Sequence, residues 1–513
     1  MTTDKPLIKL SIEEWTHEQR LAVARISAQA LTQTAPILGE TWSNDWWVAI
    51  LKYLKLTQSQ LESRVQTSQD AVTVLSTSVR DIRIEVLVDL LALALQISDK
   101  KIMIYDSRSR KFLLQLEHSL NLYRGDLTSV EKSVSQQMYY ALLESQEKNS
   151  NSSVEQNMDL SARKAMQDAS KKKQAFKWLA TGAGIIGGGA LIALTGGLAA
   201  PLLAPLLVGV TGATFFATAG GVALVTSLFG LTGGGLAGWK MHRRMKGIEQ
   251  FEFKQILNDP DLPPVPALHC TICISGFLLE DKAETKTPWE HAFERIRSTT
   301  DIYCLEYETE SLLGLGYAFR KFIRDSAINY AGMEVAKATV LHAFFAAVAL
   351  PVTILKIADV IDNPWQMVVD RSRKAGVVLA DILEERVQGN RPCNLVAYSC
   401  GCLVIWHCLQ ELKERGRYGL VDNVVMMGAP ISTEESLEWR KVTDVVSGRF
   451  VNCYTPRDWV LAYVYRLHSL ATNVAGLEPV KDVPRVENIE LDLEGHTKYP
   501  STIKEIMDLI KLE

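Results

Sequence analysis

The sequence predicts an α/β protein with a mostly parallel sheet and helices on both faces of that sheet. Three observations support this prediction. Strand-like apolar runs alternate with helix-period segments in the C-terminal half, helical patterns fill the N-terminal part, and a long uncharged tract separates the two. The 513 residues leave room for more than one domain. The expected division is an all-helical domain, a flexible linker, a glycine-rich membrane hairpin and an α/β domain, at residues 1–145, 146–170, 171–246 and 247–513.

Composition excludes several classes of function. The formal net charge is −4, so the chain has no basic surplus for gripping nucleic acid. All eight cysteines lie from Cys270 onward. The pairs Cys270–Cys273 and Cys400–Cys402 sit in apolar runs without a second ligand pair or a matching His, which disfavours a metal site. We expect buried free thiols in a reducing compartment, and neither a metal nor a cofactor.

The N-terminal 145 residues have helical patterns without catalytic spacing. Ser11 is followed by acidic residues and opens a helix, Asp81 to Asp99 is strongly apolar, and Asp126 opens a further helix. This composition predicts a packing or docking domain that could bind protein partners. Ser145 to Ser153 is polar and favours a linker.

The tract from Trp178 to Trp239 is uncharged and has basic clusters at both ends, Lys171–Lys177 and Lys240–Lys246. A membrane span needs about 20 apolar residues, so the tract is long enough for two spans. Basic flanks at both ends place both ends in the cytosol, which requires an even number of crossings. We therefore predict a multi-pass membrane protein with a two-helix hairpin and the C-terminal domain on the cytosolic face. The alternative is a buried glycine-rich hairpin in a soluble core.

The C-terminal part predicts a parallel sheet. Its candidate strands are Leu268–Ser275, Ile302–Tyr307, Asn394–Tyr398, Asn423–Met427, Arg449–Tyr454 and Val486–Leu491. Helical stretches separate most of them, as parallel strands require. The segment from Ile248 to Lys254 is interpreted as a charged link. An apolar insertion at about 312–362 predicts a cap or lid helix over a lipophilic pocket, with a third membrane crossing as the alternative.

The stretch from Leu395 to Trp406 combines an apolar strand, a sharp turn at Ser399 and an apolar helix. This pattern predicts a nucleophile elbow, and with it an α/β-hydrolase fold. Gly401 is the position that must lack a side chain, and Ala397 stands where Gly is commonest. The alternative is an ordinary strand-to-helix turn. Cys400 is a poor candidate nucleophile, because the elbow presents the residue two positions before Gly401.

A serine nucleophile needs a base, and the base needs a carboxylate that orients it. His496 follows the last predicted strand in a polar loop, where the base is expected. His407 and His468 fall in helices and are interpreted as packing residues. Asp458 follows the preceding strand and is the favoured acid. Asp492 and Glu494 remain rivals, although they share the segment of His496.

An oxyanion hole needs two backbone N–H groups. The residue after the nucleophile, Cys400, supplies one. Phe277, in the loop after the first predicted parallel strand, supplies the other, and Gly276 permits the turn. The alternative is that Gly276 only ends the strand.

Several motifs carry a resemblance to a known family. They include Gly238-Trp-Lys-Met-His-Arg-Arg, Thr271-Ile-Cys-Ile-Ser-Gly-Phe-Leu, Val424-Val-Met-Met-Gly-Ala-Pro and Glu494-Gly-His. From about Lys171 to the C-terminus the chain resembles the transmembrane and coiled-coil domain-containing protein 4 family. The resemblance implies a membrane-associated lipase or esterase with Ser399, Asp458 and His496 as the triad. The elbow departs from the family pattern Gly-Tyr/Phe-Ser-Leu-Gly-Ala, because Cys flanks Gly401 on both sides.

These observations predict a serine hydrolase bound to the lipid bilayer of an internal membrane and acting on a lipid-like ester. A peptidase or thioesterase would use the same triad. The alternative is a hydrolase-fold protein with little or no catalysis that serves as a membrane trafficking or tethering module. A channel is disfavoured, because the apolar tract has no ionisable side chain to line an ion path.

Overall fold

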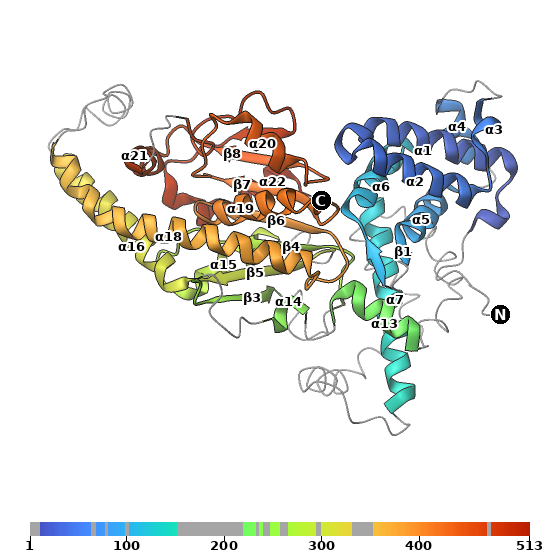
Figure 1. The fold of residues 1–513 in the computed structure, drawn as a ribbon, viewed down its shortest axis with the longest axis horizontal. Coiled ribbons are helices and arrows are strands. Elements are labelled where there is room, and N and C mark those ends of the chain that lie inside the picture. The colour runs from blue at the N-terminus through green and yellow to red at the C-terminus, as the bar shows by residue number, and fades with distance from the viewer. Residues whose placement is uncertain are drawn as a thin grey trace.

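The computed structural model describes most of the chain outside the apolar tract. The described residues are 11–62, 68–76, 81–97, 102–150, 219–231, 235–239, 247–256, 265–293, 299–330, 352–468 and 473–512. They form a helical domain and a sheet domain that lie side by side along the long axis (Figure 1).

The N-terminal domain is a helical bundle around one apolar core. Its helices are α1 (His17–Leu38), α2 (Glu40–Leu54), α3 (Gln58–Glu62), α4 (Ser68–Leu75), α5 (Arg83–Ala94), α6 (Ser107–Ser119) and α7 (Asp126–Ser150), after a 3-10 turn at Ser11–Glu14. Helix α1 begins with a capping box in which the Thr16 and Gln19 side chains satisfy each other's backbone N–H groups. Helix α7 continues to Ser150, so the predicted linker begins later than expected.

The prediction that this domain is all-helical is wrong in one place. Strands β1 (Leu95–Ile97) and β2 (Met103–Tyr105) pair antiparallel, with Leu95 opposite Tyr105. The apolar run for which the sequence predicts one helix from Asp81 to Asp99 therefore changes to a strand after Ala94. Three-residue strands are too short for a period-2 pattern to stand out against a helical one.

The predicted membrane hairpin at 171–246 lies largely outside the described residues. Within its described part, helix α13 (Ala219–Phe229) packs against α7 and β2, and its Leu224, Val225 and Leu228 belong to the core of the helical domain. An apolar, glycine-rich helix is suited to a protein core as well as to lipid. In the part of the chain that the structure describes, no helix combines the length and apolarity needed to cross a bilayer.

The C-terminal domain is built on a seven-stranded, mostly parallel sheet in the order β3-β5-β4-β6-β7-β8-β9. Its strands are β3 (Phe251–Ile256), β4 (Cys270–Ile274), β5 (Asp301–Tyr307), β6 (Cys393–Tyr398), β7 (Val421–Met427), β8 (Phe450–Tyr454) and β9 (Val486–Glu490). The six predicted strands are all present. Strands β4, β6 and β7 are buried along their whole length, as expected for the centre of a parallel sheet covered on both faces.

The prediction of a charged link from Ile248 to Lys254 is wrong, because these residues contribute to β3, the antiparallel edge strand of the sheet. Phe251 and Phe253 are buried, whereas Glu252 and Lys254, which alternate with them along the strand, are partly exposed. This alternation is the period of an edge strand. The charged residues hid it in the sequence.

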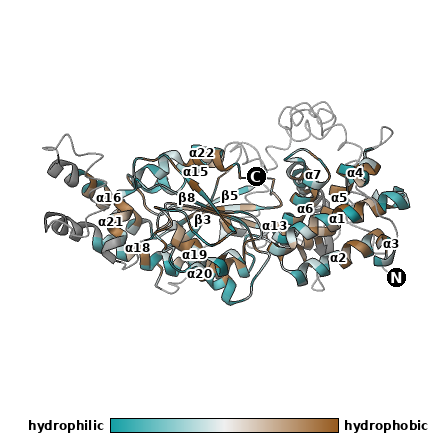
Figure 2. Ribbon diagram, turned by 90° about the horizontal axis from the view of Figure 1, so that it is seen from above, coloured by the Kyte–Doolittle hydropathy of each residue, from teal (hydrophilic) through white to brown (hydrophobic). Residues whose placement is uncertain are grey.

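Helices cover both faces of the sheet, as predicted. Figure 2 shows α15 (Thr287–Ala292) and α22 (Tyr499–Ile510) on one face, with α19 (Gly401–Glu414) and α20 (Ser436–Thr443) on the other. The remaining helices are α14 (Gly235–Gly238), α16 (Thr309–Tyr330), α18 (Val352–Glu384) and α21 (Trp459–His468), with 3-10 turns at Lys282–Thr285 and His496–Lys498. Helices α16 and α18 pack on each other and extend beyond the sheet where the cap was predicted (Figure 1). Residues 331–351 between them lie outside the described part.

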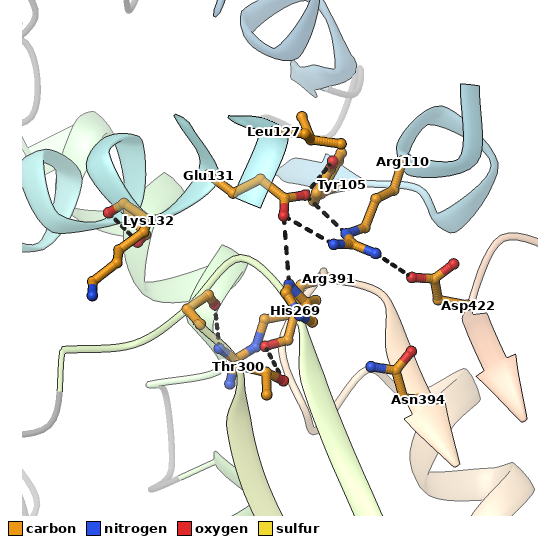
Figure 3. A network of polar contacts seen from close by, with 12 residues as sticks. Tyr105, Arg110, Leu127, Glu131, Lys132, His269, Thr300, Arg391, Asn394 and Asp422 are labelled. Carbon is orange, nitrogen blue, oxygen red and sulfur yellow. Dashed lines mark hydrogen bonds and ion pairs between the residues drawn. The ribbon is translucent and has the colours of Figure 1, made fainter. Parts of the chain in front are cut away.

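A buried polar network joins the two domains (Figure 3). The guanidinium of Arg110 on α6 donates to Glu131 on α7 at 2.9 Å and to Asp422 on β7 at 2.7 Å. All three side chains are almost fully buried. Because removing one partner of such a network leaves a buried charge unpaired, Arg110 fixes the helical domain against the sheet.

Candidate active site

Ser399 lies at the turn between β6 and α19. Its φ is +54°, a left-handed conformation that costs a non-glycine residue about 1–2 kcal/mol. The Ser399 N–H donates to the Met427 carbonyl at 2.8 Å, and its own carbonyl accepts from Cys402 N at 2.9 Å. A Cβ on Gly401 would lie 2.5 Å from the Ile274 carbonyl oxygen, so only glycine fits there. The turn therefore has the strand, strained serine and helix of the predicted elbow.

Three residues far apart in sequence meet at this turn. The Ser399 Oγ lies 2.6 Å from His496 Nε2, and His496 Nδ1 lies 2.5 Å from Asp458 Oδ2. Asp458 is further held by the Leu461 N–H, which donates to Oδ1 at 2.9 Å. Because a carboxylate can only accept, the geometry assigns the imidazole proton to Nδ1 and leaves Nε2 to accept from the serine hydroxyl.

The other candidate acids and histidines named from the sequence form no hydrogen bond with Ser399, His496 or Asp458 in the described residues. Asp492 is 85% exposed and pairs with Arg457, and Glu494 is also exposed. His407 lies on α19, where burial and then repulsion from Arg373 lower its pKa to about 4. His468 is the last residue of α21. Only His496 and Asp458 therefore have the geometry to serve Ser399.

The loop after β4 lies directly against the elbow. A Cβ on Gly276 would lie 2.2 Å from the Tyr398 carbonyl oxygen and 2.4 Å from the Cys400 nitrogen, so the approach needs glycine. Tyr398 also donates its hydroxyl to the Phe277 carbonyl at 2.9 Å. Within the described residues, the N–H groups of Phe277 and Cys400 have no hydrogen-bond acceptor. Two free N–H donors thus lie on the two segments that meet at Ser399.

Aromatic side chains enclose the imidazole. The rings of Phe277 and Phe319 lie 5.5 and 5.3 Å from that of His496. Phe319 comes from α16 and also contacts Trp365 on α18, at 6.3 Å. Ser399, Asp458 and His496 are each at most 1% exposed. The site is therefore closed to solvent beneath apolar side chains of the two cap helices.

Helix α16 is seated on the loop that contributes Phe277. A Cβ on Gly316 would overlap the Leu278 carbonyl, and the Leu278 N–H donates to the Leu312 carbonyl at 3.1 Å. Sequence reasoning predicted a cap but missed Gly316, Phe319 and Trp365. Their helical spacing is the ordinary pattern of a core-facing helix, so no signal in the sequence linked them to His496.

All eight cysteines are buried and unpaired. Burial raises the pKa of Cys400 to about 12, which keeps its thiol protonated. In the described ranges, no group of three or more His, Cys, Asp or Glu side chains is placed to hold a metal ion.

Comparison with known proteins places this site in a family. Residues 172–513 match the family described as protein of unknown function (DUF726). The transmembrane and coiled-coil domain-containing protein STS1 of rice is 36% identical over 68% of this chain and 55% of its own length. An uncharacterized membrane protein of Caenorhabditis elegans is 32% identical over 79% of this chain and 64% of its own. The probable lipase MIL1 of baker's yeast is 29% identical over 84% of this chain and 38% of its own.

The chain thus spans about two thirds or less of the length of these relatives. No solved structure matches it. The narrower resemblance to the transmembrane and coiled-coil domain-containing protein 4 group stays a prediction. The match over two thirds of the sequence and the similarity to the rice protein together show that this chain belongs to the DUF726 family.

Proposed function

We propose that the protein is a membrane-associated serine hydrolase that cleaves the acyl ester of a lipid-like molecule. One observation carries the proposal: the continuous hydrogen-bonded chain from Ser399 through His496 to Asp458 at a strained strand-to-helix turn. Serine hydrolysis needs this constellation, and an ordinary turn in an α/β domain does not.

The mechanism follows from the assigned proton positions. Ser399 Oγ attacks the ester carbonyl carbon while its proton passes to His496 Nε2, and Asp458 stabilises the imidazolium. The negative charge on the substrate oxygen is met by the N–H groups of Phe277 and Cys400, and each such donor is worth about 10²–10³ in rate. His496 then protonates the leaving alcohol. Water repeats the sequence on the acyl-enzyme and releases the acid.

Sheet topology supports an α/β-hydrolase fold for this domain. The serine follows the central parallel strand β6, the acid follows β8 and the base follows β9, which is the chain order nucleophile, acid, base of that fold. The antiparallel strand β3 at the edge leaves the parallel core of the sheet intact.

The nature of the cover supports a lipid-like substrate. Phe277 and Phe319 present apolar rings to the imidazole, and Trp365 packs on Phe319, so an acyl chain would lie among apolar rings. One relative is named a probable lipase, and others are named membrane proteins. We extend the proposal to membrane attachment through the part of the apolar tract that precedes α13, with the sheet domain on the cytosolic face.

A second candidate is a trafficking or tethering module without catalysis. Its support is the complete burial of Ser399, because no substrate reaches the serine in this conformation. Opening of the cap helices on a lipid surface would reconcile that burial with hydrolysis.

Labelling with a fluorophosphonate probe separates the two. Detergent-solubilised full-length protein and its Ser399→Ala variant are treated with the probe, with and without phosphatidylcholine liposomes. Catalysis predicts labelling of the wild type, increased by liposomes, and none of the variant. A wild type that is folded yet silent under both conditions favours the tethering module.

A further inference from the structure

A second cavity lies at the junction of the two domains, away from Ser399. Its volume is about 510 Å³. Arg108, on the first turn of α6, contributes from the helical domain, and the sheet domain contributes the end of α18 and the segment before β7. The side chain of Arg417 is 53% exposed and Tyr418 is 41% exposed, so the cavity can be reached from solvent.

The lining of this cavity is unbalanced in charge. Three arginines, Arg108, Arg386 and Arg417, face one carboxylate, that of Glu384. Glu384 already accepts hydrogen bonds from Arg417 at 2.7 Å and from Arg415 at 3.0 Å. Arg108 is paired with Asp106 at 2.7 Å. Among the three lining arginines, Arg386 therefore forms no ion pair with a carboxylate of the lining.

Arg386 is also unsatisfied in hydrogen bonding. Its Nη1 is buried and, within the described part of the chain, has no partner. Burial lowers the pKa of Arg386, Asp106 raises it, and repulsion from Arg108 lowers it further. A buried donor without an acceptor destabilises the protein, and a charged donor does so more than a neutral one. An anion in the cavity would remove this cost.

The backbone at Arg386 adds an independent observation. Its φ is +55°, just after the end of α18 at Glu384, where glycine is the favoured residue. An arginine in this conformation is strained relative to glycine. The chain thus carries a strained residue whose guanidinium lines the cavity with an unpartnered Nη1, and strained residues of this kind cluster at ligand-binding positions.

We propose that this cavity binds the phosphate groups of an organic phosphate. Guanidinium forks match phosphate oxygens in pairs, and three of them suit a multiply charged group better than a single carboxylate. The volume exceeds what inorganic phosphate would fill, which favours a phosphorylated polyol, either free in solution or as the head group of a lipid. The bound anion would contact both domains. This inference does not depend on catalysis at Ser399.

Calorimetric titration of the full-length protein with inositol 1,4,5-trisphosphate tests the proposal. We expect saturable binding that weakens as salt is raised. Arg386→Gly should reduce the affinity by about tenfold or more, because a hydrogen bond to a charged group is worth about 1.5–3 kcal/mol. Glycine suits the positive φ, so this variant should fold at least as stably as the wild type. Arg417→Gln should also weaken binding.

Arg440→Gln is the matched control, because Arg440 is an exposed arginine on α20 that does not line the cavity. It should bind like the wild type. No binding by the wild type, or equal binding by wild type and Arg386→Gly, would overturn the proposal.

Vesicle flotation distinguishes the two sources of the phosphate. Phosphatidylcholine vesicles with and without phosphatidylinositol 4,5-bisphosphate are compared for wild type and Arg386→Gly. If the phosphorylated lipid increases flotation of the wild type but not of Arg386→Gly, the cavity binds a lipid head group. Equal flotation on both vesicles, with trisphosphate binding intact, identifies a soluble ligand.

Discussion

Two of the buried polar networks in the described part of the chain differ in what they do with their charges. At the domain junction, Arg110 lies between the carboxylates of Glu131 and Asp422, and its charge is paired on both sides. At the candidate active site, the Asp458 carboxylate contacts an imidazole and a backbone N–H, and the imidazole has a serine hydroxyl on its far side. The first network holds two domains together. In the second network, the proposed mechanism moves the proton of the Ser399 hydroxyl to His496.

Two further residues sharpen the contrast. His269, beside the junction network, lies 3.7 Å from Glu131, yet burial and then repulsion from Arg110 and Arg391 lower its pKa well below the usual value. It is therefore neutral and adds no charge. Asp89, in the core of the helical domain, has no cationic partner at all in its hydrogen bonds. Buried carboxylates in this chain thus have three kinds of partner. Glu131 and Asp422 pair with an arginine, Asp458 contacts an imidazole, and Asp89 accepts hydrogen bonds from neutral donors.

The largest expected effect is on catalysis. Asp458→Asn keeps the shape of the side chain but favours the wrong imidazole tautomer, so hydrolysis of a short-chain p-nitrophenyl ester should fall about 10⁴-fold. Asp492→Asn is the control, because Asp492 is exposed and pairs with Arg457. Equal rates for wild type and Asp458→Asn would contradict the assignment of the acid.

Breaking the junction network should instead reduce stability. Arg110→Met leaves Glu131 and Asp422 buried without their cation, and should lower the free energy of unfolding by about 3–5 kcal/mol. Urea denaturation followed by tryptophan fluorescence measures this. Lys441→Met removes a cation from an exposed pair with Glu438 and should change stability by at most about 1 kcal/mol. Similar losses in both variants would refute the structural role of the buried network.

The contact between the loop after β4, which carries Phe277, and the turn at Ser399 can be tested by adding one methyl group at Gly276. Gly276→Ala places a Cβ against Tyr398 and Cys400 and must shift the Phe277 N–H, so the rate should fall about 10²–10³-fold. Gly314→Ala is a matched control on α16, since nothing lies within 4 Å of its added Cβ. Full activity of Gly276→Ala would show that the loop does not supply a donor.

The smallest effect concerns Asp89. Burial raises its pKa to about 7, against hydrogen bonds from Tyr53 and Ser11 that lower it. The folded state therefore holds a proton that the unfolded state releases near pH 4, and the stabilisation this provides is lost as pH rises through about 7. Asp89→Asn should flatten the decline in melting temperature between about pH 4 and pH 7, the window that those two pKa values set. An unchanged slope would show that Asp89 does not titrate there.

Sequence patterns predicted the parallel strands well because β4, β6 and β7 are continuous apolar runs bounded by turns. They failed at β3, where Glu252 and Lys254 masked an alternating edge strand, and at β1 and β2, which are too short to show a period. Helix α13 was predicted as part of a membrane hairpin and lies instead in a protein core, because apolarity alone does not distinguish lipid from a protein core.

At the candidate site, Ser399, His496 and Asp458 were predictable because each follows a strand in a fixed order. The aromatic cover was not, because which helix face meets His496 is decided by tertiary packing. Phe319 and Trp365 look like any other core residue in sequence. The same holds for Arg386. Its positive φ and its unpartnered Nη1 single it out in the structure, and neither is visible in the sequence.

The most direct test of the central claim is to map the fluorophosphonate adduct by peptide mass spectrometry in liposome-bound wild-type protein. The account predicts a single modified residue, Ser399, and loss of the adduct in His496→Ala, whose serine lacks its base. An adduct on another serine, or one on Ser399 that persists without His496, would contradict the proposed triad.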